Sequence, residues 1–151
     1  CGGISVAQTT TADPDGLYTL GYLEPGEYNL VVVLDGYMIA VEAGVTVEVG
    51  VINGGHNFIL TALDQGDAFH TISGEVLNVP DVSANPRVKA VTQVDSTDVV
   101  ADHSLVGKDV PSYSLSVPPG DYTLSFCADE TTTVPGQVTV DQDDVTHNTS
   151  F

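Results

Sequence analysis

The chain has 151 residues, 21 of them acidic and 3 basic, so its formal net charge at pH 7 is −18. This charge argues against nucleic acid and anionic membranes as partners, because both bind clusters of Lys and Arg. No apolar run reaches the roughly 18 residues of a bilayer span. With 42% hydrophobic residues the chain can bury a core, and its length fits one ordinary domain or two small ones. The acidity is typical of a secreted or cell-surface protein; a dedicated cation-binding surface is the alternative.

The residues before position 64 alternate apolar and polar side chains, which predicts short strands with one buried face. Such segments are residues 4–7, the stretch that begins at Leu17, and residues 45–51, where four valines alternate with other residues. Asp-Pro-Asp-Gly at 13–16 predicts a turn before Leu17. No window places apolar residues at helical spacing behind a cap, so little helix is expected.

Residues 64–67 are polar, lack alternation and predict a domain boundary. Beyond it, alternating strands are expected at 72–76, around 88–91, at 113–117 and at 122–126. Short strands separated by tight turns favour antiparallel β-sandwiches.

Two Pro-Gly pairs, Pro25-Gly26 and Pro119-Gly120, predict tight turns before a strand. In such turns the proline fixes φ at the first corner, and the glycine is expected to adopt the positive φ of the second.

The second half of the chain repeats the first. Residues 18–30 read Tyr-x-Leu-x-x-Leu-x-Pro-Gly-x-Tyr-x-Leu, and residues 113–124 read Tyr-x-Leu-x-Val-x-Pro-Gly-x-Tyr-x-Leu. A Val-x-Val strand and then His-Asn follow in both halves. The repeat predicts two tandem antiparallel sandwiches, residues 1–63 and 71–151, joined by a linker at 64–70. The matched residues are expected to serve turns and core: Tyr18, Pro25, Gly26, Tyr28, Tyr113, Pro119, Gly120 and Tyr122.

The first copy lacks a counterpart of the strand that opens the second. Residues 72–86 precede the strand around 88–91, whereas only three residues precede its counterpart at 4–7. A missing first strand leaves unpaired backbone groups and exposes apolar surface. Three explanations stay open: the chain is a piece of a longer protein, a neighbouring subunit donates the strand by complementation, or the fold does without it.

These motifs resemble carboxypeptidase regulatory-like domains, a transthyretin-like family of seven-stranded sandwiches. The resemblance is carried by Asp-Pro-Asp-Gly-Leu-Tyr at 13–18, Leu-Glu-Pro-Gly-Glu-Tyr at 23–28, Gly-Tyr at 36–37 and Val-Glu-Val at 47–49. The second copy keeps Pro-Gly-x-Tyr but has Lys-Asp-Val-Pro at 108–111 in place of Asp-x-Asp-Gly. The resemblance implies an accessory module outside the cytoplasm with no catalytic activity of its own.

The sequence shows no catalytic constellation and implies no cofactor other than calcium. His56 and His147 recur at matching positions and are expected to serve the fold. Neither acidic turn has the spaced ligands of a dedicated calcium loop, so calcium sites and solvated turns both remain as interpretations. Lys89 alternates with apolar neighbours and is expected to face water, which disfavours an isopeptide bond to Asn148. The calcium candidates are Asp13, Asp15, Asp141, Asp143 and Asp144.

The two cysteines, Cys1 and Cys127, lie at opposite ends of the chain. Cys1 fits the lipidated first residue of a mature bacterial lipoprotein, and it also fits the point where a longer chain was cut. A disulfide between the two is the other option, but their positions in different halves argue against it. Cys127 is expected to be a small residue at the edge of the core.

The expected function is structural. The chain would act at the cell surface or outside the cell as a stalk or filament subunit, with neighbouring domains or identical subunits as partners. A glycan- or protein-binding accessory domain is the alternative. For a glycan platform only Tyr22 and Tyr37 remain as candidates for exposed rings, because the other tyrosines that lie in strands fall on the apolar phase.

Overall fold

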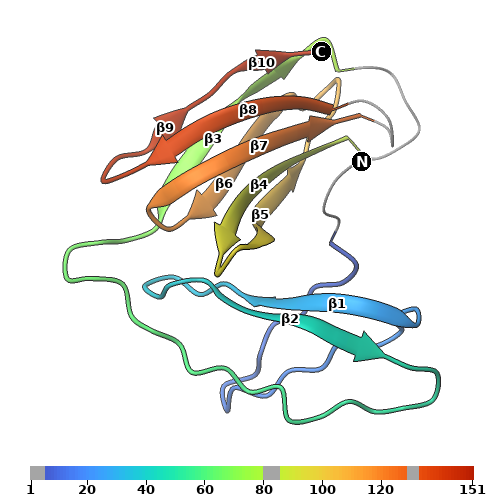
Figure 1. The fold of residues 1–151 in the computed structure, drawn as a ribbon. Coiled ribbons are helices and arrows are strands. Elements are labelled where there is room, and N and C mark those ends of the chain that lie inside the picture. The colour runs from blue at the N-terminus through green and yellow to red at the C-terminus, as the bar shows by residue number, and fades with distance from the viewer. Residues whose placement is uncertain (1–5, 80–85, 129–132) are drawn as a thin grey trace.

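The computed structural model describes residues 6–79, 86–128 and 133–151 (Figure 1). Within these residues the protein is all-β, about 49% strand, and contains no helix. The predicted fold class is therefore confirmed at the level of an all-β protein with antiparallel sheets.

Residues 70–151 form two four-stranded sheets. In the first, β3 lies centrally, with β6 antiparallel on one side and β9 and β10 parallel on the other. Its strands are β3 (His70–Leu77), β6 (Ser112–Val117), β9 (Val145–Thr146) and β10 (Thr149–Ser150). The second sheet is antiparallel in the order β5-β4-β7-β8. Its strands are β4 (Arg87–Val94), β5 (Thr97–Leu105), β7 (Gly120–Cys127) and β8 (Thr133–Val140).

One core lies between these two sheets. Side chains alternate between exposed and buried along β6, because serines alternate with Tyr113, Leu115 and Val117. The side chains of Leu115 and of Phe126 on β7 are fully buried in this core, together with residues of β3, β4 and β8. The strands predicted at 72–76, 88–91, 113–117 and 122–126 are thus all confirmed, as β3, β4, β6 and β7.

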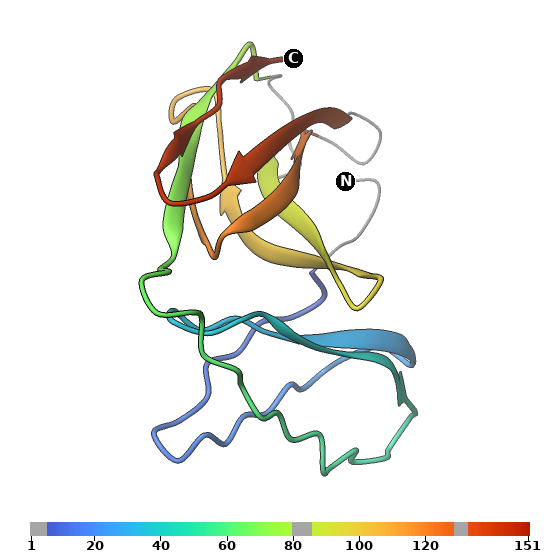
Figure 2. The same cartoon turned by 60° about the vertical axis from the view of Figure 1, so that its left-hand side comes forward.

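Residues 6–69 contain a single two-stranded sheet. Strands β1 (Gly26–Val32) and β2 (Ala40–Val47) pair antiparallel, with an irregularity between Tyr28 and Leu30. The segments 6–25 and 48–69 contain no strand, and one isolated bridge joins Tyr37 to Ala62. In both views β1 and β2 lie between the middle parts of these segments and the two larger sheets, and both strands contact β5 (Figures 1 and 2).

Three strand predictions in the first half are wrong. Of the strand expected at 4–7, residues 4 and 5 lie outside the described part of the chain, and residues 6 and 7 are not in a strand. Residues 17–20 are not in a strand either, because no neighbouring strand pairs with them. The strand predicted at 45–51 ends at Val47, since Gly50 at φ 72° closes a turn in which Val51 N–H donates to the Glu48 carbonyl at 3.4 Å. A second complete sandwich is therefore not confirmed.

The glycine of each Pro-Gly pair does not occupy the turn corner that the sequence predicts. Gly26 has no positive φ and Gly120 is close to extended, so each glycine instead begins a strand. A Cβ at Gly26 or Gly120 would lie 3.6–3.7 Å from the ring of the tyrosine two residues later, because that ring folds back over the glycine. The predicted turn at 13–16 is confirmed, with Gly16 at φ 81° and its N–H donating to the Asp13 carbonyl at 2.9 Å.

The contrast between the two halves predicts unequal costs for the same truncation. Leu115 is fully buried, whereas Leu20, at the matching repeat position, is only half-buried. We expect Leu115→Ala to lower the free energy of unfolding by about 3 kcal/mol and Leu20→Ala by about 1 kcal/mol or less. Urea unfolding followed by circular dichroism measures both, and equal losses would contradict the difference in burial.

Candidate functional site

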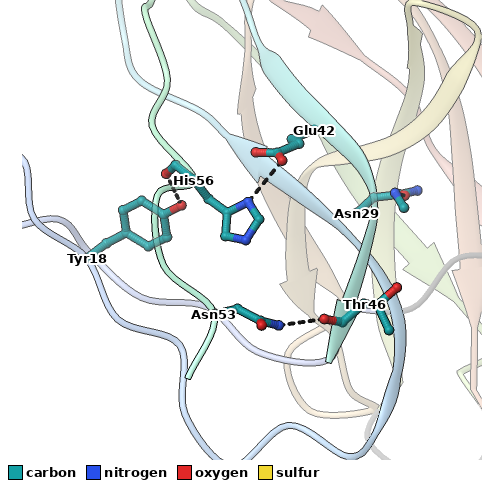
Figure 3. Close-up of polar contacts among 7 residues, drawn as sticks. Tyr18, Asn29, Glu42, Thr46, Asn53 and His56 are labelled. Atoms are coloured by element: carbon teal, nitrogen blue, oxygen red, sulfur yellow. Dashed lines mark hydrogen bonds and ion pairs between the residues drawn. The ribbon is translucent and has the colours of Figure 1, made fainter. Parts of the chain in front are cut away.

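A tyrosine hydroxyl bonds to a histidine carbonyl in each half of the chain. Tyr113 donates to the His147 carbonyl at 2.6 Å, and Tyr18 donates to the His56 carbonyl at 2.7 Å. Figure 3 shows the Tyr18 hydroxyl directed at the backbone of His56. These four residues occupy matching positions of the sequence repeat, so the two halves repeat a contact between segments that are distant in sequence.

A second contact is also repeated. Tyr28 donates to the Glu24 carbonyl at 2.8 Å, and Tyr122 donates to the Pro118 carbonyl at 2.7 Å, each four residues upstream. Such a tyrosine corner fixes the chain as it enters a strand. The sequence analysis assigned these rings to the core and did not predict the hydrogen bonds of their hydroxyl groups. The sequence did contain a signal for them, because the tyrosine and the position four residues before it match in both copies of the repeat.

In the second half, β3 runs through the space that the Tyr113–His147 bond spans. Gly74 of β3 is paired with Tyr113 of β6, and a Cβ at Gly74 would overlap the His147 carbonyl oxygen. The Ser73 carbonyl accepts the His147 N–H at 2.8 Å. The strand is thus bonded on both sides while the tyrosine crosses over its glycine.

In the described part of the first half, residues 6–69, no strand lies between the corresponding segments. Among the described residues, the backbone groups of residues 18–21 and 58–60 form no hydrogen bond with other backbone groups. Burial nevertheless alternates along both segments as it does in a strand. Tyr18 and Leu20 are half-buried, whereas their counterparts Tyr113 and Leu115 are 4% and 0% exposed. The first half therefore has strand-like segments without the strand that would join them.

Exposed apolar side chains concentrate in the first half. Of the 13 large hydrophobic residues exposed in the described chain, 10 lie in residues 6–69. The side chains of Ile52 and Ile59 are 97% and 96% exposed. Among the described residues of this half, Val45 is the one hydrophobic residue that is buried. The described first half thus exposes more of its large hydrophobic side chains than the described second half does.

The first half is also uniformly acidic. Residues 6–69 contain nine Asp and Glu residues and no Lys or Arg. His56 Nδ1 lies 2.9 Å from Glu42 Oε1 (Figure 3). Partial burial and, secondarily, the charge of Glu42 raise the pKa of Tyr18. The negative potential of this half favours neutral or cationic groups on whatever lies against it.

The structure places the calcium candidates in ordinary turn roles. Asp13 Oδ1 accepts the N–H groups of Asp15 and Leu17 at 3.0 and 2.7 Å, and Asp144 Oδ1 accepts the Thr71 N–H at 2.8 Å. Asp141 and Asp143 are exposed. Within the described ranges, no three Asp, Glu, His or Cys side chains are grouped closely enough to hold a metal ion.

A groove of about 1060 Å³ lies where the two halves meet. Met38, Ile39 and Leu63 line it from the first half, and residues of β4 and β7 line it from the second. Lys89 in its wall is 3% exposed, so the prediction that it faces water is wrong, and burial, with Arg87 as the lesser cause, lowers its pKa. No histidine or cysteine is among the described residues that line this groove.

Cys127 is fully buried at the end of β7 and is disulfide-bonded. The argument against a disulfide was therefore wrong for this residue, because separation along the sequence says little about separation in space. Cys1 is the other cysteine of the sequence and lies outside the described residues.

Comparisons with family models, curated proteins and solved structures each found no match to this chain. The resemblance to carboxypeptidase regulatory-like domains thus rests on the sequence motifs alone. No helix in the described ranges is long and apolar enough to span a membrane.

The tyrosine bonds predict an alkaline loss of stability. Burial raises the pKa of Tyr113 to about 12, whereas in the unfolded chain it is about 10. The stabilisation is therefore complete below pH 10 and is lost as the pH rises from 10 to 12. We expect about 1 kcal/mol to be lost from Tyr113 by pH 11, and less pH dependence in Tyr113→Phe. Urea unfolding at pH 8 and pH 11 tests this, and an identical pH dependence in the two proteins would refute the assignment.

Proposed function

We propose that the protein is a non-catalytic structural module that works outside the cytoplasm, as a surface stalk or as a subunit of a surface fibre. It is built from two copies of a transthyretin-like sandwich, of which the first is completed by a neighbouring chain. The observation that carries the proposal is the contrast between a second half with a closed core and a first half whose matching residues, such as Tyr18 and Leu20, are only half-buried.

The two repeated hydrogen bonds support the duplication. Tyr18 and Tyr113 bond to matching histidine carbonyls, and Tyr28 and Tyr122 each bond to the carbonyl four residues upstream. Agreement of long-range contacts at repeat positions is stronger support than agreement of turn motifs, because the partners are 38 and 34 residues apart.

Unpaired strand edges support completion by a neighbouring chain. In the second half, β7 is paired on both edges, by β4 and by β8. Its counterpart β1 is paired only by β2 in the described chain, which leaves one edge of each strand open. Open edges next to exposed apolar side chains recruit further strands, and in native proteins they are usually covered.

The disulfide of Cys127 supports a location outside the cytoplasm, because disulfides persist in oxidising compartments and are rare in reducing ones. A net charge of −18 is consistent with a soluble surface in that setting. A cysteine lipidated through its sulfur cannot form a disulfide, so lipid anchoring and disulfide formation are alternatives for any one cysteine.

A glycan-binding accessory role is the second candidate. Tyr22 is fully exposed at a positive φ of 58°, and Tyr37 is 36% exposed, as a stacking ring requires. Loss of glycan binding in Tyr22→Ala, measured on an array, would favour this role over a purely structural one.

The structural role predicts self-association that strengthens with salt. The net charge repels copies at low ionic strength, and added salt screens it. We expect a monomer at 10 mM salt and larger species at 500 mM, measured by light scattering after size-exclusion chromatography. Ile52→Ser with Ile59→Ser should reduce association, whereas the matched exposed pair Leu105→Ser with Val110→Ser in the second half should not.

The contrary result is equally clear. A protein that stays monomeric at high concentration and high salt, with amides of the first half well protected from hydrogen exchange, would exclude completion by a neighbouring chain.

A further inference from the structure

We propose that the space between residues 17–21 and 55–60 binds one extended strand of another polypeptide. The strand has the pattern apolar-x-Gly-x-apolar, with neutral or basic residues at the x positions. The inference deepens the proposed function, on which it rests, by locating the acceptor site and stating the chemistry of its occupant.

The second half of the chain serves as the filled template. There, β3 lies between β6 and the β9–β10 segment, and its Ile72 and Val76 are fully buried in the core. Gly74 sits between them, while Glu75 is exposed. The counterparts of the two flanking segments in the first half are residues 17–21 and 55–60, because Tyr18 matches Tyr113 and His56 matches His147.

The Tyr18–His56 bond indicates that the space is one strand wide. In the second half, the tyrosine reaches the histidine carbonyl across an intervening strand, and two strands flanking a third lie about 10 Å apart. Tyr18 reaches the corresponding carbonyl over nearly the same hydrogen-bond length, 2.7 Å against 2.6 Å. Because the same side chain makes the same bond at matching positions, a similar separation of the two segments is expected, although no strand of the described chain pairs with either of them.

The same bond defines the glycine in the pattern. A Cβ at Gly74 would overlap the His147 carbonyl oxygen, so the strand that passes under the tyrosine must carry glycine at that position. The apolar residues two positions before and after it fill the places of Ile72 and Val76, next to Leu20 and its neighbours.

Charge complementarity defines the remaining positions. The described first half contains nine acidic residues and no Lys or Arg, and Glu42 lies beside His56 at the mouth of the space. An acidic strand would be repelled, whereas a neutral or basic one is favoured. The chain's own β3 is not the occupant, because it is already paired on both sides within its own half and carries the acidic Glu75.

The test is binding of a fluorescent peptide to the full chain. The probe has the sequence of residues 70–78 with Glu75→Lys, and fluorescence anisotropy measures its affinity. We expect saturable binding, at least tenfold weaker when the peptide also carries Gly74→Val. The peptide that keeps Glu75 should bind several-fold more weakly at low salt, and the difference should shrink at about 0.5 M salt, where the Debye length is only a few ångströms.

Two protein variants and hydrogen exchange locate the site. Leu20→Ser should weaken binding at least tenfold, whereas Val49→Ser, a similar change at an 83% exposed position outside both segments, should leave it unchanged. Bound peptide should protect the amides of residues 18–21 and 58–60, because a strand between them pairs with both.

No saturable binding, equal affinity for the Gly74→Val peptide, or protection confined to β1 and β2 would each overturn the inference. Peptide binding without any self-association would support the acceptor site and would contradict the proposal that identical subunits form a fibre. Self-association that leaves the amides of residues 18–21 and 58–60 unprotected would support the fibre and contradict the acceptor site. The two proposals can therefore fail independently.

Discussion

The hydrogen bond from a tyrosine hydroxyl to a histidine carbonyl is the contact on which the rest of this structure depends. In the second half, the Tyr113–His147 bond passes over Gly74 and ties β6 to the last segment of the chain across β3. A buried hydroxyl group without a hydrogen-bond partner would be costly. The Tyr113 hydroxyl must therefore stay within reach of the His147 carbonyl, and this holds β6, β3 and the last segment of the chain at a fixed spacing. Phe126, stacked on His147 and edge-on to Tyr113, packs against both residues of the bond.

The same contact in the first half has a different effect, because fewer strands surround it. Tyr18 and His56 make the bond, and Tyr18 lies near Phe58 at a ring separation of 6.5 Å, but their segments stay outside any sheet. The Tyr18–His56 bond therefore forms although the two segments that it joins do not belong to a sheet. The apolar residues on the inward phase of these segments remain half-buried for that reason.

The alternation of side chains predicted four strands of the second half correctly, but it failed for the segment that begins at Leu17 in the first half. The alternation in Ser-Tyr-Ser-Leu-Ser-Val predicted β6 correctly. The prediction succeeded because the strand that pairs with β6, β3, belongs to the same chain. The equally regular alternation at 17–20 failed, since periodicity reports which face a residue prefers and not whether a neighbouring strand exists. The Pro-Gly pairs located strand starts correctly, but neither glycine occupies the left-handed turn corner that the sequence predicts, since Gly120 is close to extended and Gly26 has no positive φ. The disulfide of Cys127 had no signal in the spacing of the cysteines.

The difference between the two halves has a geometric consequence for assembly. If the open unit of one copy meets a different surface of the next copy, the contact joins two unlike patches. Contacts of this head-to-tail kind do not close by two-fold symmetry and extend into rings or polar filaments instead. A row of such subunits would have two distinguishable ends, and its growth would be directional.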